Sequence, residues 1–461
     1  MQTQCIAEQY EFSCIGGRRV VAGFDGGRVT SDAGALLLKR TDEALGLIDR
    51  LASCFIDGRR ADLIEHSVRT LVGQRVFALA LGYEDLNDHD ELRKDPLFGV
   101  LVGKLEARRS DCEALAGKST LNRLERYPKA GEFSLYHKIL PERARIERLL
   151  VELFLDSYTA APEQIVLDLD ATDAPLHGEQ EDRFFHGYYD HYCYLPLYIF
   201  CGKQLLCAKL RPANIDGSAG AIEELERTIG QVRERWPHTQ IILRADSGFA
   251  REALMSWCEA RAIDYVFGLA RNQRLQRAIG AELHEVLQRC ASSGHSERVF
   301  KELSYRTHRS WSRARRVVAK AEATPKGENP RFIVTSLSID AFAGRELYEQ
   351  LYCARGEAEN RIKECQLDLF ADRLSSELFA ANQLRLWFAS FAYVLIESLR
   401  RRALSTTRFA QATAATIRLK LLKIGAVLTL SVRRVKIAMS SAHPYPAEFA
   451  TAWHALHAAA R

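Results

Sequence analysis

The sequence predicts an α/β fold. Short runs rich in aliphatic and aromatic residues follow Pro162, namely QIVLDLDAT, YCYLPLYIFC and KQLLCAKLRP, and such runs are typical of strands. A helical stretch, GSAGAIEELERTIGQVRERW, then precedes two further apolar runs, HTQIILRADSGF and DYVFGLA. Strands joined through a helix indicate a sheet covered by helices. Because the pattern before Pro162 is mostly helical, we expect a mainly helical region in front of an α/β core.

The N-terminal region begins with an extended, glycine-rich stretch over residues 1–30. Apolar residues then recur at three- and four-residue spacing in ALLLKRTDEALGLIDRLA and SVRTLVGQRVFALALG, which predicts helices. The stretch KSTLNRLERYP predicts one more short helix, with Lys118, Arg123 and Arg126 exposed. This helix either reads DNA or is an ordinary surface helix.

The C-terminal half alternates between strand-like and helical sequence. Residues 295–338 are strand-like and basic, and long helical runs fill residues 341–366 and 379–403. The tail contains AVLTLSVRRVKIAMS, in which apolar and polar residues alternate. Alternation with a period of two predicts a hairpin here.

Composition is that of a soluble globular protein with two or three domains: 461 residues, 47% hydrophobic and 27% charged, with a net charge of +5. Basic residues gather in 298–320 and 400–436, which suits either a polyanion or a solvated surface. The 11 cysteines are scattered without a C-x-x-C pair, so we expect reduced thiols and a cytoplasmic location. Neither a signal peptide nor a membrane span is expected, because the most apolar run, 386–399, is too short.

Carboxylates follow two of the predicted buried strands. Asp168 and Asp170 end one strand and point to the same side of it, and Asp246 follows another. Buried carboxylates are costly unless they are paired, protonated or bound to a metal. If the two strands are neighbours, a divalent ion such as Mg²⁺ would relieve the repulsion between the acids.

A third acid is available in the helical run LYEQLYCARGEAENRIKECQ. Tyr352, Arg355, Glu359 and Lys363 are spaced three or four residues apart, so they share one face of an ideal helix. A carboxylate between two cations suits a metal-bound phosphodiester. An exposed ladder of salt bridges has the same spacing.

These residues resemble the acidic motifs of bacterial insertion-sequence DDE transposases of the cut-and-paste type. The motifs are Asp170-x-Thr172, Arg244-Ala-Asp246 and Tyr352-x2-Arg355-x3-Glu359. The wider sequence is similar to the insertion-sequence family numbered 1380. The segments that carry this similarity are SDAGALLL, QRVFALALGYEDLNDHDELRKDPLF, DLDATDAPLHGEQE and YCARGEAENRIKE.

The resemblance implies an RNase H-like catalytic core that carries a β-rich insertion. It divides the chain into a mainly helical DNA-binding and dimerisation region, the core, the insertion and a basic C-terminal region. The bounds that we expect are 1–160 for the first region, 161–294 with 339–403 for the core, 295–338 for the insertion and 404–461 for the last region.

The resemblance also implies roles for individual residues. Asp170, Asp246 and Glu359 would be the catalytic triad that binds two Mg²⁺ ions, with Mn²⁺ able to substitute. The residues expected to contact DNA phosphates are Tyr352, Arg355 and Lys363, and Gln366 stands where the family has a lysine. Stacking on a DNA end is expected of Trp311, together with the cations Arg313, Arg315 and Arg316.

The activity implied by the resemblance is DNA transposition. The protein would bind the terminal inverted repeats of its element, cleave the DNA ends by metal-dependent hydrolysis and join the 3′-hydroxyl ends to target DNA. Excision holds two ends together, so a homodimer on double-stranded DNA is expected. The setting would be the bacterial cytoplasm, at the nucleoid when DNA is bound.

Two other interpretations fit parts of the sequence. The motif DLDAT also matches haloacid-dehalogenase-like phosphatases, in which Asp168 would be the nucleophile and Asp170 the acid/base. A DNA-binding relative that has lost catalysis is the second alternative. Within the transposase interpretation, Asp170 is preferred to Asp168 because it lies nearer the end of the strand.

Overall fold

The computed structural model describes residues 8–127 and 136–458 and divides into two compact units. Unit 1 comprises Met1–Glu142, Asp368–Phe370 and Phe391–Arg461, and unit 2 comprises Arg143–Leu367 and Ala371–Ser390. The regions predicted as separate N- and C-terminal parts therefore belong to one unit. Its first boundary lies at residue 142 rather than 160, because α7 (Arg143–Leu155) packs on the sheet of unit 2.

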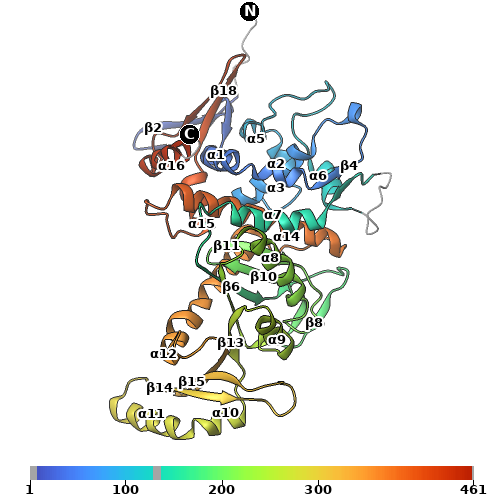
Figure 1. The fold of residues 1–461 in the computed structure, drawn as a ribbon. Coiled ribbons are helices and arrows are strands. Elements are labelled where there is room, and N and C mark those ends of the chain that lie inside the picture. The colour runs from blue at the N-terminus through green and yellow to red at the C-terminus, as the bar shows by residue number, and fades with distance from the viewer. Residues whose placement is uncertain (1–7, 128–135, 459–461) are drawn as a thin grey trace, which may run out of the picture. The chain divides into compact units, whose positions relative to one another are not determined.

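Unit 1 combines helices with three small antiparallel sheets (Figure 1). Its strands are β1 (Gln9–Ile15), β2 (Arg18–Gly23), β3 (Arg28–Thr30), β4 (Phe55–Asp57), β5 (Ile139–Pro141), β18 (Ala426–Ser431) and β19 (Arg434–Met439). Its longer helices are α1 (Leu36–Leu45), α2 (Leu47–Ala52), α3 (Val68–Leu81), α5 (Pro96–Val102), α6 (Lys118–Glu125) and α16 (Pro446–Ala458). Among its short helical segments are η1 (Ala33–Ala35), α4 (His89–Leu92) and α15 (Ala414–Ile417).

These elements confirm most of the helices and strands predicted for unit 1. The extended start is confirmed from residue 8 onward, and residues 1–7 lie outside the described part. The predicted C-terminal hairpin is β18 and β19. Ser67 caps α3 by accepting a hydrogen bond from the Thr70 amide. Nearly every residue of α3 is buried, and its buried Arg75 is paired with Glu125 of α6.

Unit 2 is built on a nine-stranded mixed sheet with the order β11-β10-β6-β12-β13-β17-β15-β14, with β16 paired to β15. The strands are β6 (Gln164–Ala171), β10 (Leu197–Cys201), β11 (Gln204–Lys209), β12 (Gln240–Ala245), β13 (Asp264–Leu269), β14 (Glu297–Tyr305), β15 (Arg315–Thr324), β16 (Gly327–Glu328) and β17 (Arg331–Thr335). Strands β6, β12 and β13 are parallel, and the other pairs are antiparallel. A smaller sheet contains β7 (Ala174–Pro175), β8 (Phe184–His186) and β9 (His191–Tyr194).

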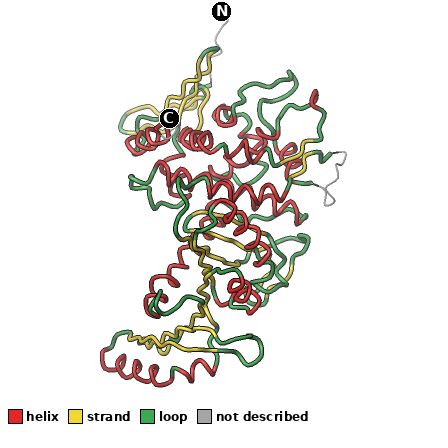
Figure 2. The backbone as a smooth tube through the Cα atoms, viewed as in Figure 1, coloured by secondary structure: helices red, strands yellow, loops and turns green. Residues whose placement is uncertain are grey.

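Unit 2 also contains helices, which Figure 2 draws in red beside the yellow strands. They include α7, α8 (Ala221–Arg235), η3 (Ser247–Phe249), α9 (Glu252–Ala260), α10 (Gln273–Ala278) and α11 (Gly280–Ser293). A continuous helical segment later in the chain comprises α12 (Gly344–Glu346), η4 (Leu347–Tyr352), η5 (Cys353–Arg355), α13 (Gly356–Lys363) and η6 (Glu364–Asp368). Finally, α14 (Phe379–Ala403) supplies residues to both units.

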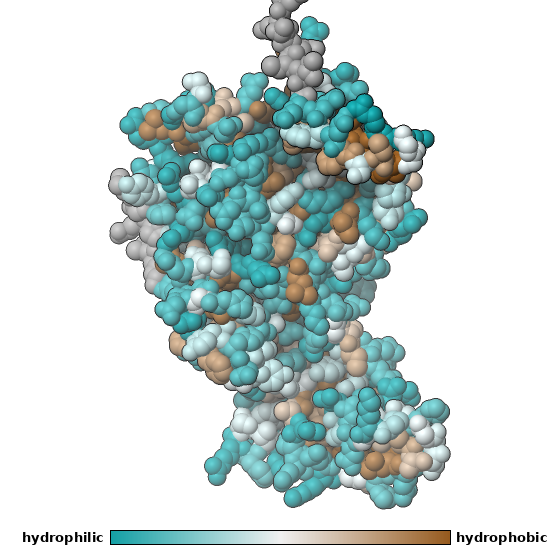
Figure 3. All heavy atoms as spheres, turned by 180° about the vertical axis from the view of Figure 1, so that it is seen from behind, coloured by the Kyte–Doolittle hydropathy of each residue, from teal (hydrophilic) through white to brown (hydrophobic). Residues whose placement is uncertain are grey.

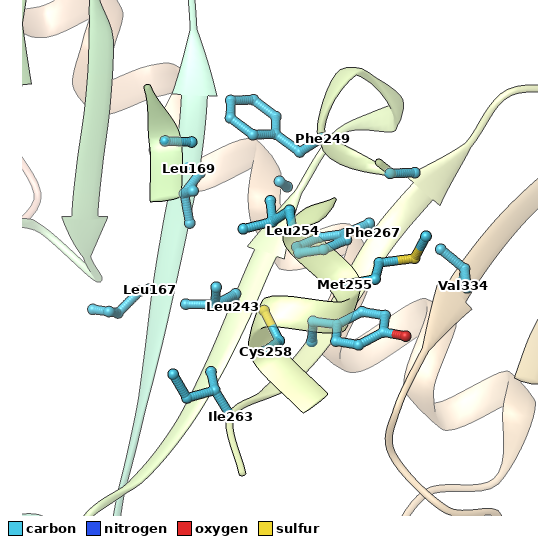
Figure 4. Packing of buried hydrophobic residues seen from close by; sticks show 14 of the residues in the cluster. Leu167, Leu169, Leu243, Phe249, Leu254, Met255, Cys258, Ile263, Phe267 and Val334 are labelled. Carbon is cyan, nitrogen blue, oxygen red and sulfur yellow. The ribbon is translucent and has the colours of Figure 1, made fainter. Parts of the chain in front are cut away.

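Side-chain alternation along β6 and β12 separates the two faces of the sheet. Leu167 and Leu169 belong to the large core that includes residues of α7, α8 and α9. Figure 4 shows them in this core together with Leu243 and residues of α9. Ile242, on the opposite face, packs with residues of η4. Because side chains alternate along a strand, Asp168 and Asp170 point toward the second face.

The predicted β-rich insertion, 295–338, does not form a separate sheet. Its strands β14, β15 and β17 extend the main sheet, since β17 pairs with β13. The preceding helix α11 packs against β14 and β15, so the added layer begins before residue 295. The sequence prediction had assigned residues 270–294 to the core and had expected no helix there.

The surface is predominantly hydrophilic on the face drawn in Figure 3. Across the described residues, we find no helix whose length and apolar character would allow it to cross a bilayer. The cysteines within this part of the chain are free thiols, most of them buried.

Candidate active site

The neighbouring parallel strands β6 and β12 bring two acids together at their carboxyl ends. In the register of β6 and β12, Asp168 lies opposite Arg244, and Leu169 lies opposite Ala245. The next step along both strands places Asp246 beside Asp170. The backbone turns immediately after Asp246, whose carboxylate accepts a hydrogen bond of 2.9 Å from the Gly248 amide. The predicted proximity of the two strands is thus present in the structure.

Asp168 is bound by Arg244 and is not among the residues that line the cavity around Asp170. Two hydrogen bonds of 2.5 and 2.8 Å join the guanidinium to the carboxylate, and both residues are buried. Arg244 also donates a hydrogen bond of 2.6 Å to the carbonyl oxygen of Leu351 in η4. Arg244 therefore ties both strands to the helical segment that carries the third acid. Burial raises the pKa of Asp168, while Arg244 opposes this shift.

The helical segment places Arg355 between two carboxylates. Its Nη2 atom lies 2.5 Å from Glu359 Oε1, and its Nη1 atom lies 3.4 Å from Asp170 Oδ2. Glu359 is one helical turn beyond Arg355, so the ion pair follows from helix geometry. The pair to Asp170 spans 185 positions of the chain and depends on the fold.

A cavity of about 860 Å³ contains all three predicted catalytic acids. Its wall also includes Arg355, Lys363, Gln366 and residues of the loops around the acids. The residues that line it are Asp170, Ala171, Thr172, Asp173, His186, Tyr188, Tyr189, Leu195, Gly217, Asp246, Gly248, Phe249, Arg251, Arg355, Glu359, Ile362, Lys363 and Gln366. Acids from three distant parts of the chain thus meet in one polar site.

Negative charge is concentrated around Asp170. Burial raises the pKa of its carboxyl to about 7; Arg355 counteracts this rise, and Asp246 and Glu359 add to it. Among the described residues, no group of three acidic, histidine or cysteine side chains stands close enough to hold a metal ion as drawn. The guanidinium of Arg355 instead supplies the positive charge. The donor set itself, three carboxylates around one cavity, fits a hard cation such as Mg²⁺.

Tyr352 interacts with the side chain of Arg355 but does not line the cavity that contains Glu359. It lines a second cavity, of about 430 Å³, with Ser247 and Gly268. The segment that carries Tyr352 and Arg355 has wide turns in η4 and a tight turn in η5, which change the rotation per residue. Burial raises the pKa of Tyr352, with Arg355 opposing the shift and Asp246 reinforcing it. Tyr352 therefore stands at the boundary between the two cavities.

Lys363 and Gln366 both reach the first cavity. Lys363 is exposed there, and the ion pairs found among the described residues include none for it. Gln366, which replaces the family lysine, donates a hydrogen bond of 2.8 Å to the carbonyl oxygen of Asp173. Of these two side chains, Lys363 brings a positive charge to the cavity wall.

The sequence analysis missed the aromatic and histidine side chains of the β8–β9 hairpin. His186, Tyr188 and Tyr189 line the cavity, and His191 forms a contact of 2.8 Å with the Asp173 carboxylate. Burial, and then Asp173 and Asp170, raise the pKa of Tyr189 to about 12. The sequence feature that could have predicted these side chains is FFHGYYDHY, a run rich in aromatic and histidine residues between two predicted strands.

Trp311 and Arg315 are buried and not placed to contact DNA, which corrects the prediction for these two residues. Trp311 is 4% exposed and packs in the main core against Tyr305. Arg313 pairs with Glu259, and Arg316 pairs with Glu302. Arg315 is buried and pairs with two acids, Glu252 and Glu259. The apolar core explains the burial of Trp311. The carboxylates of α9 explain the positions of Arg313 and Arg315, which pair with them.

The phosphatase interpretation requires Asp168 as a nucleophile, and the geometry contradicts this. Asp168 is 2% exposed, lies outside the cavity and has both carboxylate oxygens bound by Arg244. A nucleophile must reach its substrate. Asp170, rather than Asp168, is the acid that faces the cavity.

Comparison with known proteins identifies the family. The family model described as transposase DDE domain group 1 matches residues 12–461. No curated protein matches the chain. A solved structure, the cryo-EM structure of the piggyBac transposase synaptic complex with hairpin DNA, is similar with a TM-score of 0.40 and 14% identity, over 86% of this chain and 80% of that one. Since the family model spans nearly the whole sequence, the chain belongs to the transposase DDE domain group 1 family.

Proposed function

We propose that this transposase excises and inserts an insertion sequence, as the similarity to the bacterial family numbered 1380 implies. It would bind the terminal inverted repeats, cleave the DNA at the element ends and join the 3′-hydroxyl ends to target DNA. The observation that carries the proposal is the shared cavity of Asp170, Asp246 and Glu359. Three carboxylates from separate segments, with cations beside them, suit phosphodiester chemistry.

The main sheet supports an RNase H-like core for this activity. Two antiparallel strands, β10 and β11, adjoin β6, and β12 and β13 follow on its other side in parallel. Helices α8 and α9 supply the crossovers into β12 and β13. Under this proposal, β14, β15 and β17, together with α10 and α11, are an elaboration inserted between the second acid and the third.

Asp170, Asp246 and Glu359 would hold two Mg²⁺ ions. Bound there, the metal would activate the attacking hydroxyl and stabilise the charge on the phosphate and leaving oxygen. Asp170 is the residue whose protonation matters most, because its carboxyl must lose a proton to become a ligand and its pKa is raised to about 7.

Arg355 and Lys363 would bind the phosphates of the DNA strand. Arg355 holds Asp170 and Glu359 in the structure, and its fork of donors can equally hold phosphate oxygens. We infer that it turns from the carboxylates to the phosphate when DNA enters. Lys363, exposed at the cavity, would neutralise a neighbouring phosphate. Tyr352 would contact the strand from the second cavity.

The experiment is cleavage of a supercoiled plasmid that carries the coding segment and its flanking DNA. The wild type should cleave at the element ends in Mg²⁺ or Mn²⁺, and Asp246→Asn should abolish cleavage while it leaves DNA binding intact. Cleavage by pure Asp246→Asn protein would contradict the assignment. A wild type that binds the ends without cleaving under any metal condition would favour the catalytically inactive relative.

The number of protein copies is tested on the same DNA. We propose a homodimer because two ends must be held together during excision. Light scattering of the complex with two end fragments should give two chains per complex. A single chain bound to both ends would contradict this part of the proposal.

A further inference from the structure

A narrow two-stranded ribbon extends from one small sheet of unit 1. Strands β18 and β19 are paired along their whole length, from Ala426 opposite Met439 to Ser431 opposite Arg434. The third strand, β3, pairs only with Ala426, Val427 and Leu428. The remaining half of β18 therefore has β19 as its neighbour in the described structure and continues as a hairpin (Figure 1).

The two faces of this ribbon differ in character. Ile437 and Met439 pack against Ala33, Ile424, Ala426 and Phe449, which anchors the inner face to η1 and α16. On the outer face, the cross-strand pairs expose small or cationic side chains. These outer residues are Val427, Thr429, Ser431, Arg434, Lys436 and Ala438.

Positive charge on the outer face and at the tip is not neutralised by neighbouring acids. Arg433, Arg434 and Lys436 are exposed, and no ion pair of theirs occurs within the described part of the chain. The sequence from 426 to 440 contains no Asp or Glu. The turn also presents Val432 fully exposed between the strands. An apolar tip flanked by uncompensated cations, on a face of small side chains, is suited to close contact with a polyanion.

We propose that the β18–β19 ribbon enters the major groove of double-stranded DNA. The choice of DNA as the partner rests on the proposed function. The major groove of B-DNA accommodates a two-stranded ribbon, and Arg434 and Lys436 would contact phosphates across it. Val432 at the tip would make the apolar contact to base edges. This narrows the DNA contact expected of the basic segment 400–436 to the C-terminal hairpin, beside the contact that the family resemblance implies for the helical region 1–160.

The test is binding of a labelled, mixed-sequence duplex by the full chain, followed by fluorescence anisotropy over a series of salt concentrations. R434E/K436E should weaken binding about tenfold near physiological salt and should lower the slope of log affinity against log salt by about 2, since each phosphate contact contributes about 0.9. Neutral R434Q/K436Q should lower the slope equally with a smaller loss of affinity. Wild-type affinity and slope in both variants would overturn the proposal.

A matched control separates local contact from net charge. K94E/R109E makes the same change in net charge at exposed residues of unit 1, where each cation is already paired with a neighbouring acid, Glu91 or Asp111. It should bind the duplex with nearly the wild-type slope. An equal loss in the control would overturn the assignment to the ribbon. Unchanged circular dichroism and melting temperature should accompany the ribbon variants, because the substituted side chains are exposed.

Two further outcomes bear on the partner and on the groove. Binding of the wild type, but not of R434E/K436E, to phosphatidylserine vesicles, with equal DNA binding by both, would overturn the choice of DNA. Competition of the ribbon-dependent binding by distamycin, a minor-groove ligand, would overturn the choice of groove. If the wild type binds the duplex through the ribbon but fails to cleave DNA, the proposed function fails and the ribbon assignment stands.

Discussion

Asp170→Asn should stabilise the protein at neutral and alkaline pH when no metal is present. Burial raises the pKa of Asp170 to about 7 from 3.8, against the effect of Arg355 and with the help of Asp246 and Glu359. The folded protein therefore holds the proton more tightly than the unfolded chain does. The protonated carboxyl stabilises the fold below the unfolded pKa, and this contribution is lost as the pH rises through about 7.

The expected change in folding stability follows from the shift in the pKa of Asp170. One pKa unit corresponds to about 1.4 kcal/mol, so deprotonation of Asp170 across the interval between the two pKa values lowers the stability of the wild type by at most about 4 kcal/mol. The Asp170 side chain is only 16% exposed, so solvent screening removes little of this. Asparagine has nearly the same shape and does not titrate. The stability gained by Asp170→Asn should therefore grow by about 4 kcal/mol between about pH 4 and pH 8.

The assay is urea denaturation of the wild type and of Asp170→Asn in EDTA at several pH values. The exposed Asp340→Asn in the same unit is the control, and its stability difference from the wild type should not depend on pH. Added Mg²⁺ should then stabilise the wild type more than Asp170→Asn at pH 8, since the proposed ligand set is intact only in the wild type.

A constant difference between Asp170→Asn and the wild type across the pH range would refute the reasoning. Such a result would mean that the three carboxylates that line the cavity do not repel one another. If Asp170→Asn gains stability with rising pH but Mg²⁺ has no effect on either protein, the three carboxylates do repel one another, and the proposed metal site is wrong.

Three further substitutions test the surroundings of the site. Arg244→Met should destabilise the protein by about 3–5 kcal/mol in urea denaturation, because it leaves a buried carboxylate without its partner, and Asp168→Leu in the same chain should recover most of the loss. Gly268→Ala should reduce cleavage more than DNA binding in gel assays, because its Cβ would lie 2.6 Å from the hydroxyl of Tyr352 and 2.9 Å from the backbone nitrogen of Ser247, next to Asp246; equal activity would show that both groups shift without cost to the site. Trp311→Ala should cost about 3–5 kcal/mol of stability with no selective loss of affinity for DNA ends, whereas a selective loss at unchanged melting temperature would restore the stacking role.

The sequence by itself determined the local features of the site. Alternation along the strand fixed which side chains of β6 share a face, and apolar runs ending in acids marked the strand ends at Asp170 and Asp246. The helical spacing of Arg355 and Glu359 predicted their ion pair. Each of these features depends on residues within a few positions of one another, where backbone geometry alone sets the relation.

Only the tertiary structure decided which distant groups meet. The parallel register pairs Arg244 with Asp168, which leaves Asp170 as the acid of the cavity. Packing in the main core removed Trp311 from the surface, and the fold placed Tyr352 both beside Arg355 and in the wall of a second cavity. These outcomes depend on hydrogen bonding between strands and on packing across many residues. The periodicity of a single segment carries no information about the partner that another segment provides.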